Sequence, residues 1–147
     1  MRLQLALNVA DLDAAVDFYS RMFGTEPTKV KPGYANFAVA DPPLKLVLFE
    51  SAGEAGPIDH PTINHLGVET ETADEVVAAE ARLTESGLAT TGVDDTMCCY
   101  ATKTETWLDG PDGSRWEWYV KTGDSDQLTN VSVGRGDDPT AGDRCCV

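Results

Sequence analysis

Apolar positions at two different spacings predict a strand, a helix and two more strands in the first 50 residues. Residues 3–9 alternate as a strand does, and Asp11 can cap the helix that follows. Apolar residues recur there at helical spacing until Gly24 ends the helix: Leu12, Val16, Tyr19 and Phe23. Residues 34–40 and 44–50 have the pattern of strands, separated by a turn-forming Asp-Pro-Pro sequence.

The same order of elements is predicted a second time. Residues 63–69 resemble a strand, and Thr72 and Glu75 have the spacing of a capping box. The helix after this box carries an apolar stripe and is closed by Gly87; the stripe consists of Val76, Ala79 and Leu83. Further strands are predicted over three ranges, 88–93, 99–108 and 115–120.

The repeat predicts an α+β fold built from two tandem βαβββ modules that share one core. The modules span about 1–50 and 62–121, with a linker rich in Gly and Pro over 51–61, and together form one domain over 1–121. Residues 122–147 are mostly Gly, Asp, Ser and Thr, so this C-terminal tail is predicted to be disordered.

Length and charge limit the function classes. A chain of 147 residues is predicted to form one domain. It has 11 Lys and Arg against 25 Asp and Glu, a net charge of −14. A phosphate backbone or an anionic membrane surface would repel it, so neither is an expected partner. The N-terminal residues have the pattern of neither a signal peptide nor a spanning helix, which predicts a cytoplasmic protein.

The four cysteines form two adjacent pairs, Cys98-Cys99 and Cys145-Cys146. Neighbouring Cα atoms lie about 3.8 Å apart, whereas disulfides favour roughly 4.4–6.8 Å, so a bridge within a pair would be strained. The spacing also differs from that of zinc sites. A vicinal dithiol suits one soft atom bound by both sulfurs, such as trivalent arsenic or cadmium. The alternative is that the cysteines are small buried hydrophobic residues.

Capture of one atom by both sulfurs requires an irregular backbone. Neighbouring side chains on a regular strand point to opposite faces, so both sulfurs of Cys98 and Cys99 could not reach the same atom from one. We therefore expect this pair in a loop or bulge, and residues 93–99 have the polar start of a loop.

Three residues are candidate metal ligands. When the two modules are aligned, Gln4 falls opposite His65, near the start of equivalent strands. Glu117 lies between two tryptophans, so it points away from the helices if the tryptophans pack under them. An amide oxygen, an imidazole and a carboxylate would leave open positions on a redox or Lewis-acid metal. The alternative for each is an ordinary core or surface role, and a surface position is favoured for His60, in the linker.

Two segments resemble the vicinal oxygen chelate superfamily, which includes glyoxalase I, extradiol dioxygenases and fosfomycin-resistance proteins. Residues 8–24 resemble its first strand and helix, and residues 109–117 its closing turn and ligand-bearing strand. The resemblance implies a glyoxalase/bleomycin-resistance-like cleft. Within the superfamily the chain most resembles the C–As lyases and the related cadmium-induced proteins, through five segments: 4–9, 32–38, 42–48, 64–68 and 98–101.

The C–As lyase resemblance implies a non-haem Fe(II) enzyme that uses dioxygen to cleave trivalent organoarsenicals to arsenite. Methylarsenite and reduced aromatic arsenicals would be its substrates, and superfamily members often form homodimers. The implied metal ligands are Gln4, His65 and Glu117. Cys98 and Cys99 would be the catalytic thiols, and with Tyr100 they would bind the substrate.

One departure and two alternatives accompany this resemblance. Gln4 stands where many iron dioxygenases have a histidine, and Val47 aligns with Glu117, so the fourth ligand of glyoxalase I is missing. A cadmium- or arsenite-binding protein without chemistry would need the cysteines alone. Another dioxygenase of the superfamily would need only the metal site.

Overall fold

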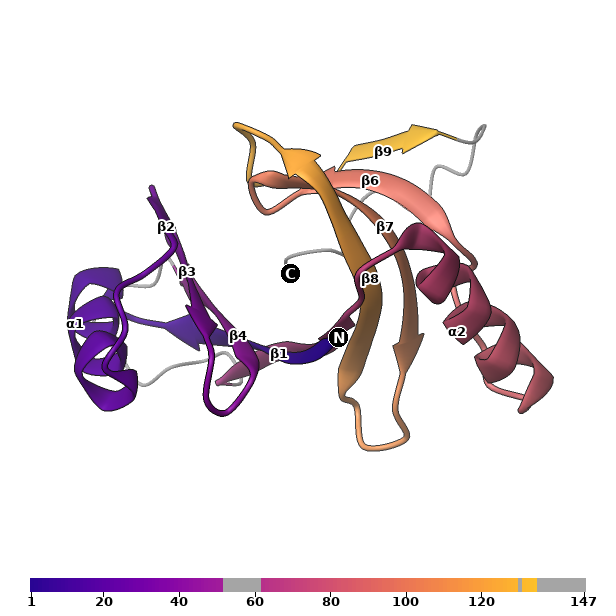
Figure 1. Cartoon of the computed structure of the whole chain (residues 1–147), viewed down its shortest axis with the longest axis horizontal. Helices are drawn as coiled ribbons and strands as arrows, with labels where there is room; N and C mark the ends of the chain where they lie inside the picture. The colour runs from indigo at the N-terminus through magenta and orange to yellow at the C-terminus, as the bar shows by residue number, and fades with distance from the viewer. Residues whose placement is uncertain (52–61, 130, 135–147) are drawn as a thin grey trace. The chain divides into compact units, whose positions relative to one another are not determined.

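The computed structural model describes residues 1–51, 62–129 and 131–134, and its chain divides into two compact units (Figure 1). The first unit comprises Arg2–Leu66, and the second comprises Met1 and the chain from Gly67 onward. The boundary falls inside strand β5 (Ile63–Glu69) rather than in the predicted linker. Residues 52–61, with His60, lie outside the described residues.

The first unit has the predicted strand–helix–strands order and one additional short strand, β2. Its elements are β1 (Arg2–Val9), α1 (Leu12–Phe23), β2 (Lys29–Lys31), β3 (Tyr34–Val39), β4 (Leu44–Glu50) and the start of β5. The strand order is β2-β3-β4-β1, followed by β5. β1 runs parallel to β4, with Leu5 opposite Leu46, whereas the β2–β3 and β3–β4 pairs are antiparallel.

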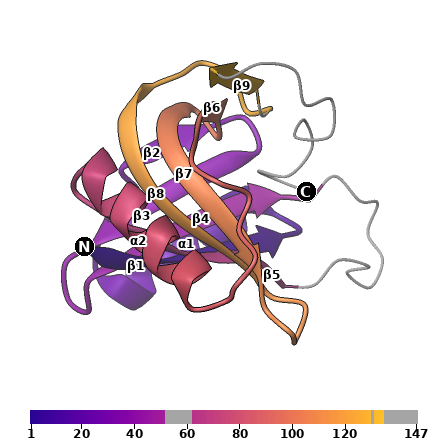
Figure 2. The same cartoon turned by 90° about the vertical axis from the view of Figure 1, so that its right-hand side faces the viewer.

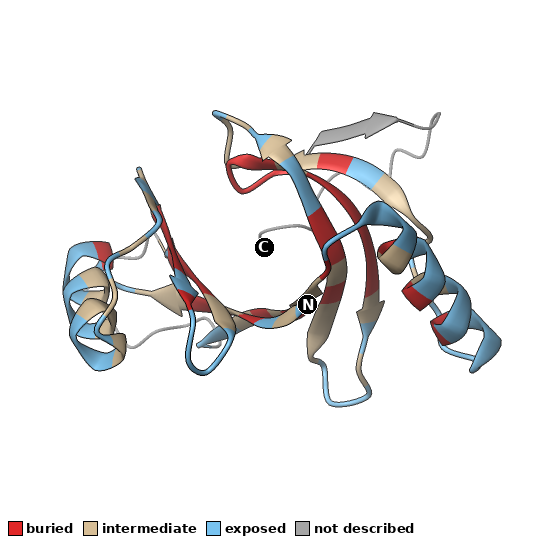
Figure 3. Ribbon diagram, in the orientation of Figure 1, coloured by how far each residue is buried: buried red, intermediate tan, exposed pale blue. Residues whose placement is uncertain are grey.

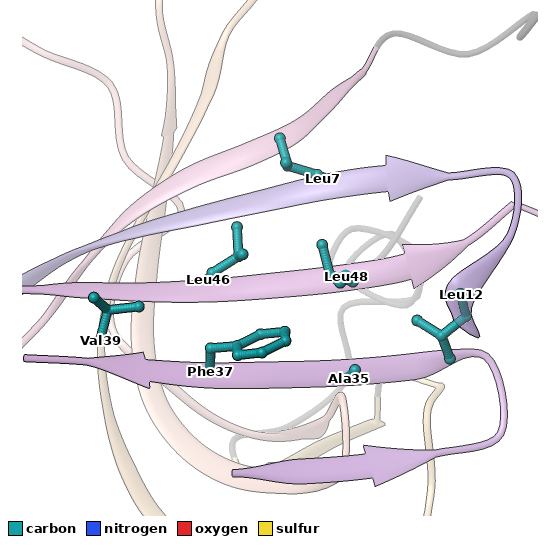
Figure 4. Packing of buried hydrophobic residues seen from close by; sticks show 7 residues of the cluster. All are labelled: Leu7, Leu12, Ala35, Phe37, Val39, Leu46 and Leu48. Carbon is teal, nitrogen blue, oxygen red and sulfur yellow. The ribbon is translucent and has the colours of Figure 1, made fainter. Parts of the chain in front are cut away.

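The core of the first unit lies between its sheet and α1. Seven buried apolar residues form it (Figure 4): Leu7, Leu12, Ala35, Phe37, Val39, Leu46 and Leu48. Val16, Tyr19 and Phe23, the predicted helix stripe, pack against this cluster. Asp11 caps α1 by accepting a hydrogen bond from the Ala14 N–H at 2.9 Å, and Gly24 ends it at φ 60°. The periodicity therefore predicted both the helix and its buried face.

The second unit has the predicted order as well. After β5 come α2 (Ala73–Glu85), β6 (Asp94–Cys98), β7 (Ala101–Asp109), β8 (Arg115–Asp124) and β9 (Val131–Gly134). Strands β8-β7-β6-β9 are neighbours in that order, and all pairs are antiparallel. Helix α2 packs on β7 and β8 (Figure 2). The Arg82 guanidinium of α2 lies 5.7 Å from the Trp118 ring centroid, so Trp118 faces the helix.

The predicted strand over 88–93 is wrong, since the strand lies at Asp94–Cys98. Gly92 has a left-handed φ of 78°, which interrupts an extended chain. The preceding Thr91 instead binds the backbone of Trp107 through its own N–H and its hydroxyl, at 2.9 and 3.0 Å. These contacts between distant residues have no signature in a local pattern.

The C-terminal segment differs from the predicted tail wherever it is described. Residues 122–124 continue β8, and β9 pairs with β6. β6 would otherwise be an edge strand with unpaired backbone groups, and the segment Val131–Gly134 pairs with these groups through its own backbone. Residues 135–147, which include Cys145 and Cys146, lie outside the described residues.

Buried positions lie along the strands of both units (Figure 3). They include Gln4 on β1, Cys98 on β6 and Glu117 on β8. Within the described ranges, no helix is long and apolar enough to cross a membrane. The two units confirm the α+β fold of paired βαβββ modules.

The capping box of α2 gives a stability prediction. The Thr72 hydroxyl accepts from the Glu75 N–H at 3.3 Å, and the Glu75 carboxylate accepts from the Thr72 N–H at 3.0 Å. Thr72→Ala is expected to lower the free energy of unfolding by about 1 kcal/mol, because one helix donor loses its acceptor. Urea unfolding measures this change. Thr72→Ser keeps the hydroxyl and should retain most of the stability; equal losses in both variants would contradict the prediction.

Candidate functional site

Cys99 and Tyr100 form the turn between β6 and β7. Cys98, the last residue of β6, pairs with Ala101, the first residue of β7, so the loop has two residues. Both have left-handed backbones, with φ of 55° and 59°. This is the geometry of a type I′ hairpin, which usually takes Asn and Gly. Left-handed non-glycine residues cost on the order of 1 kcal/mol each and concentrate at functional sites.

The segment after β8 holds this turn through backbone hydrogen bonds. The Cys99 N–H donates to the Leu128 carbonyl at 3.1 Å, and the Tyr100 N–H donates to the Gln127 carbonyl at 2.9 Å. The Tyr100 carbonyl accepts from the Ser125 N–H at 3.1 Å. Both backbone N–H groups of the left-handed residues and the Tyr100 carbonyl are thereby paired, which lets the surrounding chain maintain the turn.

The turn brings the two sulfurs together. Their Sγ atoms lie 2.8 Å apart, so one bound atom can contact both. Cys98 is fully buried, and Cys99 and Tyr100 are nearly so. The expectation that the pair leaves regular strand geometry is confirmed, because Cys99 lies in the turn. The expectation of a loop over 93–99 is wrong, because Asp94–Cys98 is a strand.

Gln4 and His65 meet in the first unit, as the alignment of the modules predicted. Gln4 lies on β1 and His65 on β5, and both side chains are buried, with 4% and 2% exposed. The Gln4 Nε2 atom lies 3.0 Å from His65 Nε2. The Phe49 ring centroid is 6.3 Å from that of the imidazole. A buried imidazole and a buried amide thus lie in direct contact.

Glu117 lies in the second unit and is fully buried. Its Oε1 atom accepts a hydrogen bond from Lys103 Nζ at 2.6 Å. Lys103 also lies 3.8 Å from Glu105 Oε2 and 4.7 Å from the centroid of the Tyr119 ring. Glu105 pairs with Tyr119 and Trp107 with Glu117, which puts these side chains on one face of the β7–β8 ladder. The carboxylate is therefore held inside a buried row of charged and aromatic groups.

The prediction of site residues from the sequence missed Lys103 and Glu105. Both are buried, with 6% and 3% exposed. Their signal was the alternation Lys103, Glu105, Trp107, which places two charges on the same face as a tryptophan. Tyr100, the aromatic residue expected to act with the two cysteines, lies with Cys99 in the turn between β6 and β7.

The candidate ligands are chemically suited to a metal. They supply one imidazole nitrogen, one amide and one carboxylate, all buried. Within the described ranges no three His, Cys, Asp or Glu side chains lie close enough together to hold a metal ion. The predicted ligand set differs from such a group, because it consists of one His, one Glu and the amide of Gln4.

Glu105 gives a prediction for the metal-free protein. Burial and the neighbouring charge of Glu117 raise the pKa of Glu105 from its ordinary 4.5 to about 8, and the Lys103 ammonium only partly opposes them. The folded state therefore binds the proton more tightly than the unfolded state does. The resulting stability is fully present below pH 4.5 and is lost as the pH rises to about 8.

Glu105→Gln removes this titration while keeping a neutral side chain of the same shape. Relative to the variant, the wild-type protein should lose up to about 1.4 kcal/mol of unfolding free energy per pH unit within that window. Urea unfolding at a series of pH values measures both proteins. Parallel pH profiles would contradict the prediction.

Comparisons with known proteins show the family of this chain. Residues 3–118 match the model of the Glyoxalase/Bleomycin resistance protein/Dioxygenase superfamily. The chain is 57% identical over 130 residues to a protein named trivalent organoarsenical cleaving enzyme from Thermomonospora curvata, covering 88% of this chain and 83% of that one. It is 53% identical over 147 residues to the cadmium-induced protein CadI of Mycobacterium tuberculosis, covering 99% and 92%.

A solved structure supports the fold. The Mn(II)-bound glyoxalase from Novosphingobium aromaticivorans matches with a TM-score of 0.58 at 19% identity, over 85% of this chain and 40% of that one. The identity is low, so this match bears on the fold alone. Because the family model covers most of the sequence and curated relatives are identical at more than half of the aligned positions, the chain belongs to the Glyoxalase/Bleomycin resistance protein/Dioxygenase superfamily.

Proposed function

We propose that this protein cleaves the carbon–arsenic bond of trivalent organoarsenicals, with Fe(II) and dioxygen, and releases arsenite. The observation that carries the proposal is the 2.8 Å separation of the Cys98 and Cys99 sulfurs in a buried turn. The names of the curated relatives support the proposal. Two proteins named trivalent organoarsenical cleaving enzyme are 57% and 38% identical to this chain, which is therefore an enzyme of its superfamily.

Substrate capture follows from the chemistry of the thiol pair. Monosubstituted trivalent arsenic carries one carbon and two exchangeable hydroxyl groups. Each thiol of Cys98 and Cys99 replaces one hydroxyl, so two As–S bonds form and two waters leave. The second bond forms within one complex and therefore needs no further encounter. Arsenic bound in this way keeps its carbon substituent, and Tyr100 is adjacent in the turn.

We propose Gln4, His65 and Glu117 as the Fe(II) ligands. The imidazole, the amide and the carboxylate would hold Fe(II) with positions left open, and the metal would supply the redox chemistry that uses dioxygen. The polar ends of His65 and Gln4 lie 3.0 Å apart, and Lys103 holds the Glu117 carboxylate. Burial of all three candidate ligands excludes water from them. The cytoplasm suits the reaction, because thiols stay reduced there. A homodimer stays a prediction from the resemblance.

A second candidate function is sequestration of a soft metal without chemistry. The 53% identity to a protein named cadmium-induced protein CadI favours it. Sequestration needs only the sulfur pair of Cys98 and Cys99, since two thiolates can hold cadmium or arsenite.

One assay separates the two functions. Reduced protein is loaded anaerobically with Fe(II), given methylarsenite and then exposed to air, and the arsenic species are separated by chromatography with mass detection. Arsenite that depends on both iron and oxygen is the expected product. Methylarsenite recovered bound but unchanged would contradict the lyase proposal and support sequestration. Boiled protein with the same Fe(II) is the control for non-enzymatic oxidation.

A further inference from the structure

We propose that Asn8 and Asn64 are positioning residues that keep His65 in the tautomer with its lone pair on Nε2. The assignment of the tautomer stands on hydrogen bonds within the first unit. Its functional meaning rests on the proposed function, in which His65 is a metal ligand. Neither asparagine was among the residues that the sequence marked as candidates.

The direction of the Asn64 amide is the first step. Asn64 Nδ2 donates to Asn8 Oδ1 at 3.0 Å. An amide has its donors on one end and its acceptor on the other, so Asn64 turns its oxygen toward the opposite side. That oxygen lies 2.8 Å from His65 Nδ1. Because a carbonyl oxygen can only accept, Nδ1 is the nitrogen that carries the proton.

The second step concerns the other ring nitrogen. A neutral imidazole has one N–H, so protonated Nδ1 leaves an acceptor at Nε2. Gln4 Nε2 lies 3.0 Å from it, and an amide nitrogen can only donate. The three contacts therefore run in one consistent direction, from the Asn8 oxygen through Asn64 and His65 to the Gln4 nitrogen. The opposite tautomer would require the amides to reverse together.

The strand arrangement explains why these residues meet. Asn8 and Gln4 lie on β1 and project to the same side, since they are four residues apart. The Asn8 N–H donates to the Thr62 carbonyl at 2.8 Å, which places the end of β1 beside the start of β5, where Asn64 and His65 lie. The register of two strands thus sets the chain of hydrogen bonds.

This chain of hydrogen bonds prepares His65 for a metal. Only a nitrogen with a lone pair can coordinate, and a partner on the other ring nitrogen fixes which one has it. In the metal-free protein the Gln4 side-chain N–H donates a hydrogen bond to the lone pair of His65 Nε2. An amide binds metal through its oxygen. Metal binding therefore also requires the Gln4 amide to rotate, so that its oxygen replaces its nitrogen on the side that faces His65.

Two matched substitutions test the role of Asn8. Asn8→Asp keeps an oxygen that accepts from Asn64 Nδ2, whereas Asn8→Leu has a similar size and no acceptor. In the leucine variant the Asn64 amide is free to reverse and offer its N–H to Nδ1, which favours the other tautomer. Asn64→Asp, which can only accept from Nδ1–H, should retain the wild-type tautomer.

The readout is long-range ¹H–¹⁵N NMR of the histidine rings in the metal-free full chain, at a pH where imidazole is neutral. His60→Gln identifies the signals of the second histidine. Wild type, Asn8→Asp and Asn64→Asp are expected in the Nδ1–H form, and Asn8→Leu as a mixture. Mn(II) titration of the same proteins should show about 10–100-fold weaker binding for Asn8→Leu and near wild-type binding for Asn8→Asp.

An Nε2–H tautomer in the wild-type protein would overturn the proposal without any variant, so a leucine variant that fails to fold does not leave it open. An unchanged tautomer in folded Asn8→Leu would overturn the role of Asn8. Wild-type protein in the expected tautomer that takes up no Mn(II) would overturn the link to metal binding. That last result counts against the proposed function and not against the tautomer.

Discussion

Replacing Cys98 with serine is expected to reduce kcat/KM for methylarsenite cleavage by at least about 10²-fold. Two sulfurs 2.8 Å apart can hold arsenic through two bonds, and one sulfur can form only one. The lost bond is intramolecular, so its removal costs both affinity and the fixed placement of the substrate. A serine hydroxyl does not replace it, because arsenic favours soft sulfur over oxygen, and water competes for the same position.

The measurement combines turnover with two binding assays. Arsenite formation is followed by chromatography, methylarsenite binding is measured without oxygen, and Mn(II) binding is measured without arsenical. Cys98→Ser should lose arsenite formation and methylarsenite binding. It should keep Mn(II) binding, because Cys98 is outside the proposed ligand set. Cys99→Ser should behave alike. Cys145→Ser is the matched thiol control and should retain turnover. Full activity of Cys98→Ser would remove the thiol pair from the mechanism.

Replacing Glu117 with glutamine is expected to weaken metal binding by at least about 100-fold, since it removes the anionic member of the proposed ligand set. The substitution also has a structural cost. Lys103 Nζ lies 2.6 Å from Glu117 Oε1 and both are buried, so removal of the carboxylate charge leaves a buried ammonium poorly compensated. Breaking one partner of a buried pair typically costs about 3–5 kcal/mol.

Two further variants separate the metal effect from the structural cost. Lys103→Met combined with Glu117→Gln removes both charges and should regain much of the lost stability without regaining metal affinity. Glu105→Gln lies on the same face and should retain metal binding, since Glu105 is outside the ligand set. Mn(II) titration and urea unfolding of all four proteins give the two readouts. Wild-type metal affinity in Glu117→Gln would refute its role as a ligand.

Most of the secondary structure followed from local patterns. The stripe of Leu12, Val16, Tyr19 and Phe23 predicted α1 together with the face that packs on the sheet. The capping box of α2 was visible as Thr72 and Glu75. Such features depend on residues within one helix and its cap, so sequence spacing is sufficient to predict them.

Part of the candidate site was predictable as well, because it repeats. Gln4 and His65 were paired by aligning two copies of one module, and the structure places their nitrogens 3.0 Å apart. The adjacent cysteines indicated a thiol site, and the geometry of neighbouring strand residues required an irregular backbone. The turn at Cys99 and Tyr100 meets that requirement.

The sequence by itself determined the α+β elements, the repeat of modules, the thiol pair and the meeting of Gln4 with His65. Only the tertiary structure decided where β6 lies, that Val131–Gly134 pairs with β6 as β9, and that Lys103 and Glu105 are buried beside Glu117. It also decided the direction of the Asn8–Asn64–His65 hydrogen bonds. Each of these features depends on strand register or on pairing between residues far apart in the chain. A short segment of sequence does not contain both partners, so its local pattern cannot predict the energy of the pairing.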